Sequence, residues 1–139
     1  MKIKYLLLYI ALITFFSCSN RHEVVEKKYP DGSPKVVKIY EGSGADKKLV
    51  KEISYYPGKK KYIEGEIKHD SIKDGKWTVW YQNGKVWSEG YFKDDKADGK
   101  RTVYYENGNK RYEGEFKDGV RTGTWNFYDE QGKLVNTQK

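Results

Sequence analysis

Few residues of this chain have the types and spacing that catalysis or metal binding requires. His22 and His69 are its only histidines, and neither has a cysteine nucleophile or a cluster of acids near it in the sequence. A catalytic base or a metal ligand needs partners of that kind. We therefore expect both histidines to be solvated, and we expect a protein that is not an enzyme and binds no metal and no cofactor.

Three glutamates recur at equivalent places along the chain, namely Glu64, Glu89 and Glu113. Paired carboxylates are the catalytic groups of glycosidases. Recurrence in every copy of a repeat instead favours a structural role, with Glu89 opposite Thr78 and Glu113 opposite Thr102 on neighbouring strands.

The segment 94–99 is superficially similar to a calcium-binding loop. However, Lys96 takes the third ligand position, and Tyr105 stands where a bidentate glutamate belongs. This segment is therefore predicted to be a polar turn.

The N-terminus has the pattern of a secretory signal. Lys2 and Lys4 precede an apolar stretch, Tyr5–Phe16, and Ser17 and Cys18 follow it. The stretch is shorter than the roughly 20 residues that a helix needs to cross a bilayer. Cys18 is the only cysteine, and an unpaired thiol in a secreted protein needs an explanation.

The position of Cys18 resembles a bacterial lipobox. This resemblance implies cleavage before Cys18 and a lipid on its sulfur, which would anchor the protein to a membrane. Ser19 follows the cysteine, and by resemblance to enterobacterial sorting this favours the outer membrane of a Gram-negative envelope. The periplasmic and the surface orientations both stay open.

A short repeat accounts for most of the remaining chain. Glycines recur every 24 or 26 residues, at positions 32, 58, 84, 108 and 132. The residues around them recur as well, as in Trp77-Thr-Val-Trp-Tyr-Gln-Asn-Gly84 and Arg101-Thr-Val-Tyr-Tyr-Glu-Asn-Gly108. Such fixed-period similarity is typical of a repeat array.

Each repeat holds two segments rich in Trp, Tyr, Val and Phe, bounded by Gly, Asn and Asp. This pattern is typical of strands joined by hairpins, so we predict an all-β fold, a repetitive antiparallel β-meander forming one twisted or curled sheet. Asn83-Gly84 and Asn107-Gly108 are predicted to be two-residue type I′ turns. Those turns predict cross-strand pairs, namely Trp80 with Trp87, Val79 with Ser88 and Trp77 with Gly90.

Alternation along the strands sorts the side chains onto two faces. The predicted core face, on which Gly90 leaves room for Trp77, carries Trp77, Val79, Tyr81, Phe92, Val103, Tyr105, Tyr112, Phe116, Trp125, Phe127 and Leu134. The opposite face carries the candidate partner-binding patch, which comprises Trp80, Trp87, Tyr104, Arg111 and Tyr128. Trp, Tyr and Arg dominate interface hot spots, although cross-strand stiffening is an equally good explanation of these aromatics.

The repeats resemble the bacterial variant of the MORN family, most clearly over 112–128 and more broadly from about Tyr55 to Leu134. The resemblance implies a β-meander that serves as a binding scaffold for proteins or membranes. Some bacterial members of the family carry an antitoxin-like label.

Together these patterns predict a lipoprotein signal peptide at 1–17, a flexible tether at 18–28 and a MORN-like domain at 29–139, whose first copy, 29–54, is degenerate. The net charge of +7 permits contact with anionic partners. We expect an envelope protein partner, with binding of glycan, cell wall or a membrane surface as the alternative. Nucleic acid is not expected beside a membrane anchor, and homodimerisation would be one way to cover the core face.

Overall fold

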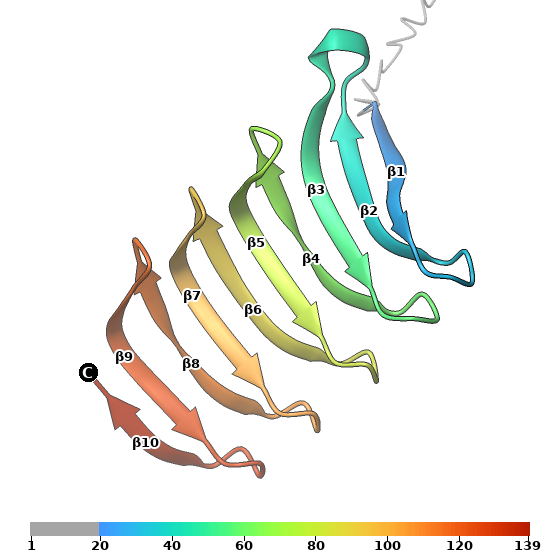
Figure 1. Cartoon of the computed structure of the whole chain (residues 1–139). Helices are drawn as coiled ribbons and strands as arrows, with labels where there is room; N and C mark the ends of the chain where they lie inside the picture. The colour runs from blue at the N-terminus through green and yellow to red at the C-terminus, as the bar shows by residue number, and fades with distance from the viewer. Residues whose placement is uncertain (1–19) are drawn as a thin grey trace, which may run out of the picture.

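The computed structural model describes residues 20–139, which form one open, ten-stranded antiparallel sheet with its strands in sequence order (Figure 1). The strands are β1 (Arg21–Lys28), β2 (Pro34–Glu41), β3 (Lys48–Tyr55), β4 (Lys61–Lys68), β5 (Ile72–Trp80), β6 (Val86–Lys93), β7 (Lys96–Tyr104), β8 (Lys110–Lys117), β9 (Val120–Tyr128) and β10 (Leu134–Gln138). A short 3-10 turn, η1 (Gly44–Asp46), lies between β2 and β3, in the glycine-rich stretch that separates these strands. The predicted all-β meander is confirmed.

The sheet is a single layer, and each strand pairs only with its neighbours in sequence. Burial therefore comes from adjacent repeats, and few apolar side chains are fully covered: Val37, Leu49, Ile53, Trp77, Val103 and Trp125. Such an array is stabilised through nearest-neighbour contacts, as in other repeat proteins. Within residues 20–139, no helix has the length and apolar character needed to span a bilayer.

The strands bend sharply partway along their length (Figure 1). At the bend of β5, Gly65 pairs with Trp77 and Ile67 pairs with Lys73. More residues lie between these two pairs on β5 than on β4, so β5 forms a bulge here. Gly75 lies in this bulge with a φ of 99°, which L side chains rarely adopt. Similar register shifts occur between β6 and β7 and between β8 and β9, so each repeat bends at the same place.

The hairpin turns at one end of the sheet differ from the predicted type I′ turns. Gly84 has a φ of 89°, but Asn83 does not have a positive φ. The N–H of Gly84 donates to Tyr81 O at 2.9 Å, and the N–H of Tyr81 donates to Lys85 O at 2.8 Å. This is a three-residue loop that places only Gly84 in the left-handed region, and Asn107-Gly108 forms the same turn.

Because the turn type differs, the predicted strand register is wrong, but only for the residues next to the turn. Val79 pairs with Ser88 and Trp77 with Gly90, as predicted, but Trp80 pairs with Val86 instead of Trp87. A bulge next to the turn absorbs the extra residue, so the strand interiors keep the predicted alternation.

Two-residue turns with positive φ lie at the opposite end of the sheet. Asp94 and Asp95 have φ of 50° and 65°, and Asp118 and Gly119 have φ of 49° and 86°. They join directly paired residues, Lys93 to Lys96 and Lys117 to Val120. The polar turn predicted over 94–99 is therefore confined to Asp94 and Asp95, because β7 begins at Lys96.

The tether predicted over 18–28 is wrong for residues 21–28, which form β1. Val25 pairs with Val37 and His22 with Tyr40, and the rings of His22 and Tyr40 stack at 5.8 Å. The strand alternates in exposure only weakly, because charged residues cover both of its faces. The sheet therefore begins at residue 21 instead of 29.

Packing on the predicted core face is tightest where a large side chain lies over a glycine of the neighbouring strand. Trp77 lies over Gly65, Trp125 over Gly114, and Arg101 over Gly90. The prediction that Gly90 leaves room for Trp77 is therefore wrong, because the side chain of Arg101 occupies the space over Gly90. Leu134, which is also predicted to lie in the core, is 50% exposed because β10 is the edge strand.

Candidate interaction surfaces

Tyrosine hydroxyls connect consecutive hairpins at the end of the sheet where the three-residue turns lie. Tyr81 Oη donates to Tyr104 O at 2.8 Å, and Tyr105 Oη donates to Tyr128 O at 2.9 Å. Tyr29 and Tyr56 make the equivalent bonds to the backbone oxygens of Tyr55 and Trp80. This row of hydrogen bonds fixes the spacing of the repeats and therefore of every surface built on them.

Glu113 is the centre of a polar cluster in the C-terminal repeats. Its carboxylate accepts hydrogen bonds from Tyr128 Oη at 2.8 Å and from Lys110 Nζ at 3.0 Å, and it pairs with Lys100 at 3.1 Å. Burial alone would raise the pKa of Glu113, but the hydrogen bonds from Lys110, Tyr128 and Lys100 outweigh it and lower the pKa to about 2. Glu113 is therefore a stable anion with fully occupied oxygens.

The equivalent glutamates are paired in the same way. Glu89 pairs with Lys76 at 2.5 Å, and Glu64 pairs with Lys61 at 2.6 Å. The predicted cross-strand positions are confirmed, since Glu89 faces Thr78 and Glu113 faces Thr102. A carboxylate held as an ion pair in each repeat is suited to stabilising the sheet and poorly suited to donating a proton.

The five residues of the candidate patch make contacts in two separate rows. Tyr128 belongs to the Glu113 cluster, Tyr104 Oη lies 3.5 Å from Glu89, and the Trp80 ring lies 5.6 Å from Lys61 Nζ.

Trp87 and Arg111 occupy the bulges next to the turns. Trp87 packs against Tyr81 with ring centroids 6.3 Å apart, and the Arg111 guanidinium lies 5.7 Å from the centre of the Tyr105 ring. The cross-strand pair of Trp80 with Trp87 that would have joined the two rows is absent. A binding role for these residues stays a prediction.

The sequence did not predict which residue forms the bulge, because the position of the bulge depends on the turn type. Every repeat has one such residue, displaced from the regular pairing: Lys35, Tyr62, Trp87, Arg111 and Val135. Tyr62 and Trp87 are both 40% exposed, so this row presents large side chains to solvent.

The two histidines lie in different surroundings. His22 stacks on Tyr40, and His69 lies in a turn with a φ of 47°. Among residues 20–139, no cluster of three His, Cys, Asp or Glu side chains could hold a metal ion. Cys18, the predicted lipidation site, lies outside the described residues.

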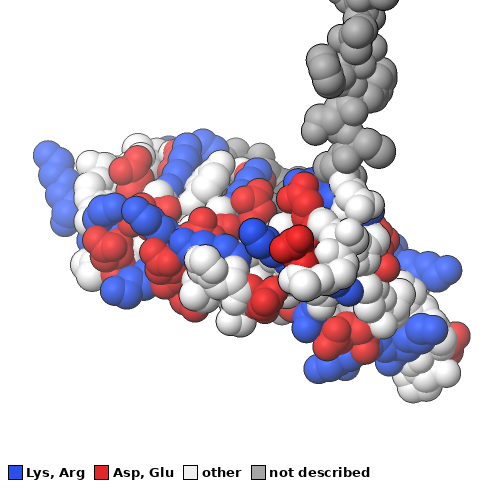
Figure 2. Space-filling view, turned by 90° about the horizontal axis from the view of Figure 1, so that it is seen from above, with Lys and Arg blue, Asp and Glu red and all other residues white. Residues whose placement is uncertain are grey.

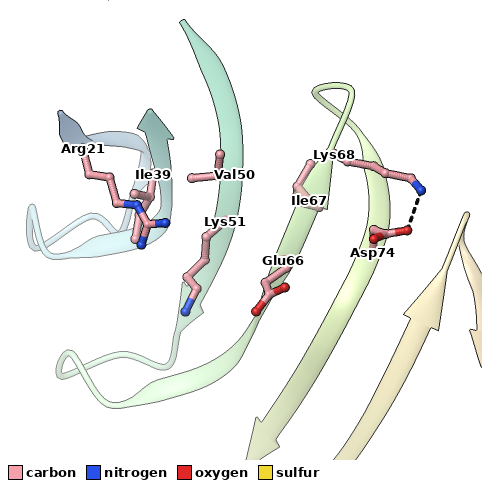
Figure 3. A pocket seen from close by; sticks show the side chains of 8 residues that line it. All are labelled: Arg21, Ile39, Val50, Lys51, Glu66, Ile67, Lys68 and Asp74. Carbon is pink, nitrogen blue, oxygen red and sulfur yellow. Dashed lines mark ion pairs between the residues drawn. The ribbon is translucent and has the colours of Figure 1, made fainter. Parts of the chain in front are cut away.

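A hollow of about 450 Å³ spans the N-terminal repeats (Figure 3). The side chains that line it come from β1 to β5: Arg21, Ile39, Val50, Lys51, Glu66, Ile67, Lys68 and Asp74. Its cations have acidic partners, since Lys68 pairs with Asp74 at 2.6 Å and Arg21 with Glu41 at 3.5 Å. Figure 2 shows the same mixture of basic and acidic side chains over the face it displays.

A second hollow, of about 370 Å³, lies in the C-terminal repeats. It is lined mainly by aromatic and arginine side chains: Ala97, Arg101, Tyr112, Phe116, Arg121, Trp125 and Phe127. We call it the C-terminal hollow. None of its lining residues is acidic, in contrast to the hollow of Figure 3. The sequence placed four of these aromatics on one face but did not predict a hollow there.

Comparison with known protein families identifies the repeat. Residues 73–94 and 97–118 each match the family model described as MORN repeat variant. The matched segments run from β5 through β6 and from β7 through β8, so each includes one turn of the three-residue type. A search of curated proteins and of solved structures finds no match to the chain.

Proposed function

Because this chain is a MORN-variant repeat protein, we propose that it is a non-catalytic interaction scaffold or accessory subunit, held at the bacterial cell envelope by a lipid on Cys18. Repeats of this kind generally serve as modules for binding proteins or membranes. The sequence supports the envelope location through the charged and apolar N-terminal segment and the position of Cys18 directly after it. The outer membrane is the proposed site, by the same resemblance.

The observation that carries the scaffold proposal is the state of the acidic side chains. A hydrolytic site needs a carboxylate with a shifted pKa near the working pH, yet the repeated glutamates of this sheet are held as ion pairs. The exposed side chains Tyr62, Trp87 and Tyr91, by contrast, are of the types that dominate protein interfaces. The sheet thus offers surface for binding and little for proton transfer.

Partner isolation tests this proposal. The full-length protein with a C-terminal tag is isolated from its native envelope in mild detergent, beside Cys18→Ala, and co-isolated proteins are identified by mass spectrometry. We expect one stoichiometric partner with the wild type, and a mass increase on the wild-type Cys18 peptide that Cys18→Ala lacks. Recovery of both versions alone would contradict the scaffold proposal and favour glycan, cell-wall or membrane-surface binding, whereas an unmodified Cys18 would contradict the anchor only.

A further inference from the structure

The C-terminal hollow exists because one repeat departs from its neighbours at two positions. Residues 73, 97 and 121 are equivalent, as are 77, 101 and 125, since each set is spaced by one repeat. In the first and last of these repeats a cation covers a tryptophan four residues later. Lys73 Nζ lies 4.4 Å from the centre of the Trp77 ring, and the Arg121 guanidinium lies 3.9 Å from that of Trp125.

The middle repeat has neither member of this pair. Ala97 stands at the cation position and Arg101 at the tryptophan position. The small side chain of Ala97 does not cover its neighbour as Lys73 and Arg121 do, and Ala97 and Arg101 both line the hollow. The opening is therefore a property of this repeat and not of the fold in general.

The walls of the hollow are aromatic and held in place. Phe116 meets Trp125 edge to face at 5.1 Å, and Tyr112 lies 6.0 Å from Trp125. Trp125 Nε1 donates to Thr122 O at 3.1 Å, which fixes the indole. A rigid aromatic surface of this kind binds an apolar side chain with little loss of conformational entropy.

Within residues 20–139, the two arginines of the hollow have no acidic partner. The Arg101 guanidinium donates a hydrogen bond to the Ser88 hydroxyl at 3.4 Å, and the Arg121 guanidinium donates one to the Gln138 amide oxygen at 3.4 Å. Among the ion pairs within residues 20–139, none includes either guanidinium. Guanidinium groups form their strongest hydrogen bonds with carboxylates, often in bidentate geometry.

From this combination we infer that the C-terminal hollow binds an acidic segment of a protein partner in which a carboxylate lies beside an aromatic or large apolar residue. The carboxylate pairs with Arg101 and Arg121, and the apolar side chain rests against Tyr112 and Phe116, which line the hollow and are only partly buried. This inference rests on the scaffold function proposed above and gives its partner a chemistry. Carbohydrate fits less well, because two unpaired cations on an aromatic wall favour an anion over neutral hydroxyls.

The test uses the full-length protein and fluorescein-labelled hexapeptides, with binding followed by fluorescence anisotropy. The probe is Gly-Asp-Phe-Asp-Phe-Gly, and its two controls replace both Asp by Lys or both Phe by Ser. We expect the probe to bind at least about tenfold more tightly than either control, and to weaken as salt is raised. Equal binding of all three peptides would overturn the inference.

The matched variant is the double substitution Ala97→Lys and Arg101→Trp, which gives the middle repeat the residues of its neighbour at 73 and 77. This sheet already accommodates that pair, so the variant is expected to fold, and circular dichroism and urea unfolding check this directly. We expect at least about a tenfold loss of probe affinity, because a lysine and an indole fill the hollow. Arg101→Gln with Arg121→Gln removes the charge without filling the hollow and should cause a similar loss.

Unchanged probe binding by both variants would place the contact elsewhere and overturn the inference. Binding of phosphatidylglycerol vesicles that the variants abolish, without binding of the probe, would also overturn it in favour of an anionic membrane. If the envelope isolation recovers the same partner with the filled variant as with the wild type, the scaffold function stands and only the hollow is eliminated. If no partner is recovered although the probe binds as expected, the scaffold function fails while the acid-recognition chemistry stands.

Discussion

The indole ring of Trp77 lies so close to the backbone of Gly65 that a β-carbon on Gly65 would overlap ring atoms. Trp125 has the same relationship with Gly114. The glycine is therefore needed for the space above it, since Gly65 and Gly114 do not have a positive φ. Tight packing of this kind does not tolerate an added methyl group without displacement of the ring.

Gly65→Ala should lower the free energy of unfolding by about 2 kcal/mol, because Trp77 is forced from its position. Urea unfolding followed by tryptophan fluorescence measures this. The double variant Gly65→Ala with Trp77→Leu provides the control, since the alanine should add much less destabilisation once the ring is absent. Fully additive losses in the two single variants would contradict a direct clash.

Two tryptophans of the same repeat should differ widely in their contribution to stability. Trp77 is 6% exposed and Trp87 is 40% exposed. Trp77→Ala should cost about 3 kcal/mol or more, as large core truncations do, whereas Trp87→Ala should cost about 1 kcal/mol or less. Thermal or urea unfolding of both variants decides this, and equal losses would show that the row of bulge residues is part of the core.

Tyr105→Phe tests the hydrogen bonds that join consecutive hairpins. Loss of the Tyr105 hydroxyl leaves Tyr128 O without this donor, so we expect a loss of about 1 kcal/mol in unfolding free energy. Tyr91→Phe is a suitable control, because Tyr91 is 45% exposed and its hydroxyl makes no hydrogen bond to another residue in the described part of the chain. Similar losses of unfolding free energy in the two variants would show that the hydrogen bond to Tyr128 O does not stabilise the sheet.

The strand interiors could be predicted from the sequence, and the ends of the strands could not. Alternation of apolar and polar residues determines which residues pair within a strand, so the pair of Val79 with Ser88 was correct. The turn chemistry of Asn-Gly fits both a two-residue and a three-residue loop, and the choice between them moved Trp87 out of register with Trp80. That single choice also separates the residues of the candidate patch into two rows.

Charge concealed the other features that the sequence did not predict. β1 is rich in Glu and Lys, a composition that predicts a tether, although cross-strand ion pairs such as Lys38 with Glu26 stabilise it in the sheet. Arg101 fitted the repeat pattern as an ordinary strand residue. Its role becomes clear only by comparison with the neighbouring repeats, in which a tryptophan covered by a cation takes the equivalent position.

The Glu113 cluster predicts how stability depends on pH. The pKa of Glu113 is about 2 in the folded protein and 4.5 for an unperturbed carboxyl, so its contribution is present above about pH 4.5 and is lost as the pH falls toward 2. The lysine partners are largely exposed, and solvent screening reduces this contribution to about 1 kcal/mol. Glu113→Gln should therefore be less stable than the wild type at pH 7 and equally stable near pH 2. Urea unfolding across this range measures the difference, and a constant offset at every pH would show that Glu113 acts through packing instead of through its charge.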